Sequence, residues 1–324
     1  MQALTRLLRR SWPWLVGIAI LVVVITRVPV AAFRDGIAHG PHVALASLNL
    51  GIVVSVLAVD SFATWVGLIA LRLRRPFGDV VSVRGATYAL FVVNYAVGQG
   101  AFGYYLHRSG ASVARATGAT LFLLGTNFAA MIVLTTIAMA AGDVVLPSPR
   151  LFEMLQLSCA ALVAYLVVIA IAPRVLRRGV FEPLFDARVS GHALAIAARV
   201  PHVVVAVLGQ WLALRVWHVP VPFEVGIVAM PIVVIASALP ISPAGLGTMQ
   251  AMLLYMFSKY APGATAADRD GALLAFAIVH FVYGVVASLL VGFLSMPFAK
   301  RRGVLDRPSE PATRHQVPDD SATA

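Results

Sequence analysis

Long apolar stretches separated by short basic loops constrain this chain more than any other feature of its sequence. A helix needs about 20 apolar residues to cross about 30 Å of hydrocarbon, and only helices or closed β-barrels satisfy their backbone groups there. The sequence lacks the alternating strands of a membrane barrel. Stretches of sufficient length lie at about 13–32, 43–70, 112–140, 151–172, 192–217 and 271–298. We therefore predict an all-α polytopic membrane protein with about six transmembrane helices.

The composition excludes a water-soluble fold. Hydrophobic residues make up 60% of the chain and charged residues 12%, whereas a soluble domain carries about 25% charged residues. The formal net charge of +11 does not indicate nucleic acid, because the basic residues lie in short clusters between apolar runs. We predict no nucleic-acid partner and interpret the clusters as signals of membrane topology.

Two further apolar segments, 80–106 and 223–258, are interrupted by Gly and Pro near their middles. If 80–106 were a simple crossing and the N-terminus were cytoplasmic, the basic cluster from Arg174 to Arg188 would lie outside, against the positive-inside rule. If the segment enters and returns, most of the 25 Lys and Arg collect inside. We therefore predict two re-entrant half-helices that meet at Gly98-Gln99-Gly100.

The second interrupted segment follows the same reasoning, because both of its flanks must be external for the basic tail to be cytoplasmic. The two halves then share one plan with opposite starting sides, which predicts an inverted repeat. We expect a single flippase-like transmembrane domain over 1–298, with pseudo-repeats at about 1–141 and 142–298. A disordered cytoplasmic tail over 299–324 follows. The expected location is a bacterial-type inner membrane, with both termini in the cytoplasm.

The first interruption carries polar side chains. The residues from Gly98 to Gly103 match G-x-G-x-x-G, but no βαβ unit surrounds them, so we do not predict a nucleotide site. These glycines indicate either close helix packing or a broken helix that lines a cavity. Arg84, near the cytoplasmic entry, either binds substrate or extends to the lipid headgroups. The candidate substrate-binding residues here are Arg84, Asn94, Gln99 and Tyr104.

The second interruption runs from Pro240 to Thr248. Its prolines remove backbone donors, and its glycines permit a tight turn into the following helix. Exposed amides at such a helix start attract anions such as phosphate, although a simple structural kink is the alternative. The candidate substrate-binding residues here are Ser242, Gly245, Gly247, Thr248 and Gln250.

Asp60 is the one acid deep inside a continuous apolar span. A lone intramembrane charge is expensive and is a functional candidate by default. It can pair with a basic residue, coordinate a cation, carry a proton or make a structural hydrogen bond. The isolated residues His107, His202 and His280 favour packing over metal binding, and no catalytic motif is present. We predict no metal, no cofactor and no enzymatic activity.

The stretch from Leu239 to Gln250, LPISPAGLGTMQ, resembles the P-x-S-P-x-G-x-G-x-x-E motif of the lysylphosphatidylglycerol synthase transmembrane family, also called flippase-like. The stretch from Asn94 to Gly110 is similar to that family's earlier Gly-rich motif. The chain departs from the family pattern at Gln250, where Glu is usual, and at Val97–Phe102, where P-G-R-x-G-E is usual. In the full-length synthases a separate soluble domain performs aminoacylation, and here only 299–324 follow the last predicted span.

This resemblance implies a protein that moves a lipid or lipid-linked amphiphile between leaflets. A polar cavity at the membrane midplane, between the two broken segments, is expected to hold the headgroup. A non-transporting partner of a lipid synthase or glycosyltransferase is the alternative function. The expected partners are therefore a membrane lipid and, in the alternative, a membrane enzyme.

Overall fold

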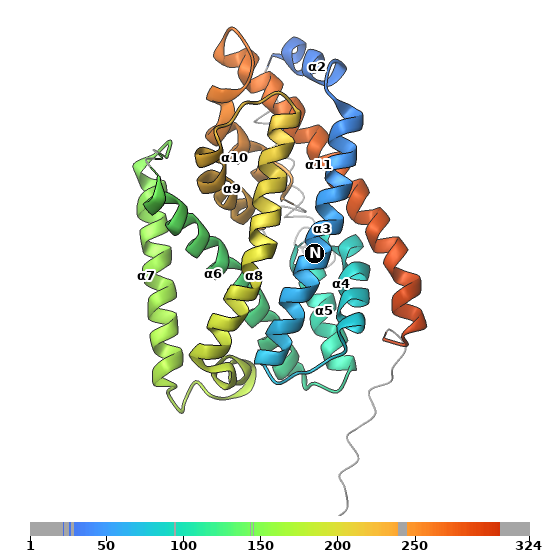
Figure 1. The fold of residues 1–324 in the computed structure, drawn as a ribbon, viewed down its shortest axis with the longest axis vertical. Helices are drawn as coiled ribbons and strands as arrows, with labels where there is room; N and C mark the ends of the chain where they lie inside the picture. The colour runs from blue at the N-terminus through green and yellow to red at the C-terminus, as the bar shows by residue number, and fades with distance from the viewer. Residues whose placement is uncertain are drawn as a thin grey trace, which may run out of the picture.

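A computed structural model shows a bundle of helices (Figure 1). It describes residues 22, 26, 29–93, 95–142, 144, 146–238 and 245–304. Within these residues every regular element is helical. The α-helices are α2 Val30–Ala38, α3 His42–Ala70, α4 Phe77–Phe91, α5 Tyr95–Arg108, α6 Val113–Ala141, α7 Pro149–Ile171, α8 Glu182–Val216, α9 Phe223–Ala238, α10 Thr248–Phe257 and α11 Ala266–Arg301. Short 3₁₀ helices occupy Gly179–Phe181 and Ser258–Tyr260.

Five of the six predicted spans correspond to helices long and apolar enough to cross a membrane. They are α3, α6, α7, α8 together with the 3₁₀ turn before it, and α11. The all-α polytopic membrane class is thus confirmed. The sixth predicted span, 13–32, lies mostly outside the described residues, as does most of the predicted tail at 299–324. The last helix nevertheless reaches Arg301, three residues beyond the predicted end of the transmembrane domain.

The two interrupted segments each form a pair of short helices. Helices of 15, 14, 16 and 10 residues make up α4, α5, α9 and α10, so each is about 15–24 Å long, less than the hydrocarbon thickness. In Figure 1 the α4–α5 pair lies in the lower half of the bundle and the α9–α10 pair in the upper half. The members of each pair pack against each other.

The first interruption does not lie at Gly98-Gln99-Gly100, so that prediction was wrong. Helix α4 ends at Phe91, a turn closes with the Val93 amide donating to the Leu90 carbonyl, and α5 begins at Tyr95. The glycines lie inside α5, where a Cβ on Gly98 would approach the Phe91 ring to 2.3 Å. Gly98 and Gly103 permit close packing, which an α-helix accommodates without breaking.

The second interruption lies where the sequence places it, since α9 ends at Ala238 and α10 begins at Thr248. Gly245 and Gly247 have φ of +76° and +85°. Residues with a side chain rarely adopt this conformation, so glycine is needed for the turn into α10.

Basic residues separate between the two ends of the bundle. The connections α3–α4, α5–α6 and α7–α8 meet at the lower end in Figure 1, where α11 also ends. Basic residues in or beside these connections are Arg72, Arg74, Arg75, Arg108, Arg115, Arg174, Arg177 and Arg178. The upper end carries fewer, namely Arg34 in α2, Arg150, Arg215 in the last turn of α8, Lys259 and Arg269.

Two clusters of buried apolar side chains hold the bundle together. One includes Leu45 of α3 and Phe276 of α11, and the other includes Leu68 of α3 and Ala299 of α11. Both helices therefore contribute to both clusters, and the parts of α3 and α11 between the clusters are left to line a cavity.

Candidate functional site

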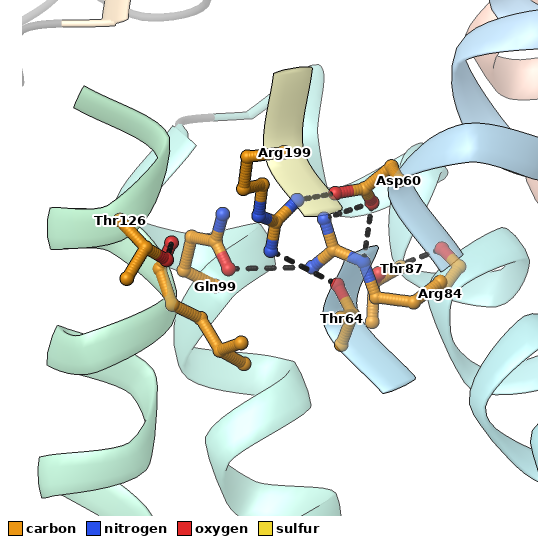
Figure 2. Close-up of polar contacts among 8 residues, drawn as sticks. Asp60, Thr64, Arg84, Thr87, Gln99, Thr126 and Arg199 are labelled. Atoms are coloured by element: carbon orange, nitrogen blue, oxygen red, sulfur yellow. Dashed lines mark hydrogen bonds and ion pairs between the residues drawn. The ribbon is translucent and has the colours of Figure 1, made fainter. Parts of the chain in front are cut away.

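Three charged side chains meet in the interior of the bundle (Figure 2). Asp60 of α3 accepts a hydrogen bond from Arg84 Nε at 2.7 Å and forms ion pairs with Arg84 Nη2 and Arg199 Nη1. Their exposed fractions are 2%, 4% and 3% for Asp60, Arg84 and Arg199. Of the roles open to Asp60, pairing with a basic residue is the one that the structure shows.

Further contacts orient Arg84. Its Nη1 donates to Gln99 Oε1 of α5 at 3.3 Å. The guanidinium carbon lies 5.3 Å from the Phe91 ring centroid and 5.5 Å from that of Phe102. Both distances fall within the range of cation–π attraction. Arg84 therefore points into the bundle and does not extend to the headgroup region.

Arg199 enters the same cluster from the interior of α8. Its Nη2 donates to Thr64 Oγ1 at 3.1 Å. Thr64 lies one helical turn after Asp60, so one face of α3 presents both acceptors to Arg199. The Nε of Arg199 is buried and has no hydrogen-bond partner among the described residues.

A cavity of about 360 Å³ opens onto this charged cluster. This volume falls in the range of about 300–1,000 Å³ that is typical of small-molecule sites. Apolar side chains such as Val56, Leu123 and Met131 form part of the wall. The polar and charged lining residues are Asn49, Asp60, Arg84, Gln99, Asn127, Arg199, His202, Gln210, Ser237 and His280.

Helical periodicity explains why distant residues line one cavity. On α8 the lining residues Arg199, His202, Ala206 and Gln210 recur every three to four positions, which is the spacing of one helix face. Asn49, Val56 and Asp60 repeat the pattern on α3, and His280, Gly284 and Ser288 repeat it on α11. Each of these three helices therefore turns one mixed polar stripe toward the cavity.

The lining also contains a second polar contact. His280 Nε2 lies 2.7 Å from Gln210 Oε1, and the His280 ring stacks on Phe276 with centroids 5.2 Å apart. No cluster of three or more His, Cys, Asp or Glu suited to a metal ion occurs in the part of the chain that the structure describes.

The structure brings together three of the predicted substrate-binding residues, namely Asp60, Arg84 and Gln99. Tyr104 is 62% exposed and is not part of the cavity lining. Asn94 and Ser242 lie outside the described residues.

The remaining predicted residues shape the start of α10. Gln250 is fully buried, and its Oε1 accepts a hydrogen bond from the Gly247 amide at 2.7 Å. Thr248 Oγ1 donates to the Gly245 carbonyl at 3.1 Å. Neither Gln250 nor Thr248 lines the cavity, although Met249 between them does. In this structure these residues hold the turn, and the cavity meets α10 at an apolar side chain.

Sequence reasoning did not select Arg199, His202, Gln210 or His280 as site residues. Arg199 carried a usable signal, since a charged residue inside an apolar span is a functional candidate by default. Its distance from Asp60, 139 residues along the chain, hides the pairing from any local pattern.

No protein-family model matches the chain, and no curated protein matches it either. The cavity and its charged cluster are therefore interpreted from their own chemistry.

Proposed function

We propose that this integral membrane protein moves a lipid or lipid-linked amphiphile between leaflets, with the headgroup held in the cavity. The observation that carries this proposal is a polar cavity with buried charges inside a helix bundle whose spans are long enough to cross a membrane. Charged residues in such a position are costly and mark substrate or ion pathways. We further propose that the chain catalyses no reaction of its own.

The depth of the cluster supports this function. Asp60 lies ten residues before the end of α3 at Ala70, which is about 15 Å along the helix. Arg199 lies eleven residues after Arg188, where φ of 54° interrupts α8, which is about 16 Å. Both distances are close to half of the roughly 30 Å of hydrocarbon. A headgroup at this depth is midway between the leaflets.

The two short helix pairs support alternating access. Each pair is too short for two full crossings, and the pairs occupy opposite halves of the bundle (Figure 1). We propose that α4–α5 and α9–α10 are re-entrant from opposite sides, as the halves of an inverted repeat. Rocking of one half against the other then exposes the cavity to each leaflet in turn.

We assign the lower end in Figure 1 to the cytoplasm of a bacterial-type inner membrane. The basic residues collect at that end, as the positive-inside rule requires of cytoplasmic loops. We retain the resemblance to the lysylphosphatidylglycerol synthase transmembrane family as a proposal for the transmembrane domain alone.

Reconstitution in liposomes tests the function. The purified full chain is incorporated with fluorescent lipids that differ in headgroup, and the accessible fraction of each label is followed with a membrane-impermeant quencher. We expect at least one lipid to equilibrate faster than in protein-free vesicles. The Asp60→Asn variant is expected to slow this movement. Thr136→Ala, at an exposed position of α6 outside the cavity lining, is expected to retain it.

Absence of movement for anionic, aminoacylated and polyprenyl lipids alike would contradict transport. Copurification of a lipid synthase or glycosyltransferase in that case would favour the partner function.

Cysteine accessibility tests the orientation. In a Cys159→Ala background, single cysteines at positions 108 and 174 should both react only from the cytoplasmic side. Labelling of either from outside would contradict the re-entrant topology.

A further inference from the structure

The charges around the cavity do not balance. Among the described lining residues the ionised side chains are Arg84, Arg199 and Asp60, and with the histidines neutral they leave one positive charge in excess. An uncompensated buried charge is strongly destabilising, so a partner for it has a clear energetic advantage. The cavity is therefore suited to a ligand that brings one negative charge.

The two guanidiniums are arranged to receive an anion. Figure 2 shows them side by side, with Asp60 bridging them on one side. Their nitrogens already donate to Asp60, Gln99 and Thr64, so an anion here is attracted chiefly by the excess positive charge of the pair. Asp60, Gln99 and Thr64 already hold both groups in position, so little ordering is required when a ligand binds.

A donor with no acceptor points to the same ligand. The Nε–H of Arg199 is buried without a hydrogen-bond partner among the described residues. Arg199 also lines the cavity. Buried donors without acceptors are rare in folded proteins, and an oxyanion beside Arg199 would satisfy this one.

We propose that the cavity selects a lipid headgroup with a single negative charge, carried by a phosphodiester, and that Asp60 sets this limit. This inference rests on the proposed function of lipid translocation. Asp60 neutralises one of the two arginines and leaves a charge that one phosphodiester balances. A phosphomonoester, with a charge of about −1.5 to −2 at pH 7, overcompensates the site. A zwitterionic or aminoacylated headgroup brings an amine that the excess positive charge repels.

The test compares lipids of one acyl composition that differ only in headgroup. The purified full chain is placed in phosphatidylcholine vesicles containing traces of tail-labelled phosphatidylglycerol, phosphatidic acid or phosphatidylethanolamine. Binding of the same three lipids to the detergent-solubilised protein is measured separately by native mass spectrometry. We expect phosphatidylglycerol to be preferred in both measurements by about tenfold, the scale of one charge-assisted hydrogen bond.

Two charge variants move the preference in opposite directions. Asp60→Asn raises the excess to two positive charges, so the preference should shift to phosphatidic acid. Gln99→Glu places a carboxylate beside Arg84 and removes the excess, so the preference for anionic lipids should be lost. Thr136→Ala, at an exposed position of α6 outside the cavity lining, leaves the charge unchanged and should retain the preference for phosphatidylglycerol. If Asp60→Asn does not purify as a folded protein, Gln99→Glu and Thr136→Ala decide the test.

The outcomes separate the two proposals. Transport that is equally fast for all three lipids, with no binding preference, overturns the charge rule and leaves translocation intact. A binding preference for phosphatidylglycerol without any transport supports the charged site and overturns translocation. An unchanged preference in Gln99→Glu overturns the role of the net charge.

Discussion

The α4–α5 pair and the α9–α10 pair bring different chemistry to the same cavity. The first contributes Arg84 and Gln99, and the second contributes Val234, Ser237 and Met249. The charged side of the cavity thus belongs to one helix pair and the neutral side to the other. Asp60 and Arg199, from α3 and α8, complete the charged side.

The two interruptions also differ in how the backbone turns. The first turns over Val92 and Val93 without glycine in the described residues, and its glycines lie within α5. The second needs Gly245 and Gly247 at positive φ. Gly98 therefore marks close packing in the first pair, whereas Gly245 and Gly247 mark a turn in the second. Substitutions can test this contrast between α4–α5, which carries charge, and α9–α10, which depends on a glycine turn.

Removing Asp60 is expected to have the largest effect on stability. Asp60→Ala leaves two buried guanidiniums without their shared carboxylate, and loss of one partner from a buried ion pair costs about 3–5 kcal/mol. The free energy of unfolding in detergent micelles measures this change. Asp35→Ala is the matched control, because the Asp35 side chain is 75% exposed, and it should change stability little. Equal effects of the two variants would contradict the buried cluster.

New carboxylates in the two helix pairs should be tolerated very differently. Gln250→Glu places a charge at a fully buried position in a segment, 239–257, that contains no charged residue, so we expect a loss of about 3 kcal/mol. Gln99→Glu places the carboxylate beside the buried Arg84 in a site with excess positive charge. Because the attraction between the two groups offsets most of the cost of burying the carboxylate, we expect a loss below about 1 kcal/mol.

Unfolding of both glutamate variants under the same conditions measures the difference. A smaller loss for Gln250→Glu than for Gln99→Glu would contradict the contrast between a charged first pair and an uncharged second pair.

Alanine substitutions should separate the turn glycine from the helical ones. In Gly245→Ala the residue must keep a φ of +76°, and its Cβ would lie 2.8 Å from the Ser237 carbonyl oxygen, so we expect a loss of about 1–2 kcal/mol or more. Gly100 lies inside α5 with nothing near its added Cβ, so Gly100→Ala should stabilise the protein by about 0.5–1 kcal/mol.

Thermal unfolding of both alanine variants provides the measurement. Destabilisation by Gly100→Ala would indicate that the first pair also depends on glycine for its backbone conformation.

The smallest expected effect concerns an ion pair at the N-terminal end of α4. Arg302 Nη1 lies 3.2 Å from Asp79 Oδ1 in the first turn of α4, with the Arg302 side chain 50% exposed. Arg302→Gln should cost less than about 1 kcal/mol, because solvent screens the pair. Glu224, in the first turn of α9, has no ion pair within the described part of the chain, so Glu224→Gln serves as the control. A loss above 2 kcal/mol for Arg302→Gln would mean that this contact anchors the first pair.

The length and polarity of the apolar stretches were sufficient to predict the membrane class and the positions of five spanning helices. Hydrocarbon of fixed thickness imposes a length on every span, and this length is visible along the chain. The glycines from Gly98 to Gly103 misled the prediction of the first interruption. A glycine can serve either a turn or close packing, and the sequence does not distinguish the two. At Gly98 the Phe91 ring of the neighbouring helix shows that the glycine serves packing.

Sequence alone determined that this chain crosses a membrane and where the second interruption lies. It also determined that a buried charge at Asp60 is costly enough to need a partner. The tertiary structure decided what that partner is. Arg84 and Arg199 lie 24 and 139 residues from Asp60 along the chain, and three helices had to pack before the carboxylate could bridge them. Helical periodicity places each residue on a face of its own helix, but the choice of which faces meet depends on the packing of the whole bundle.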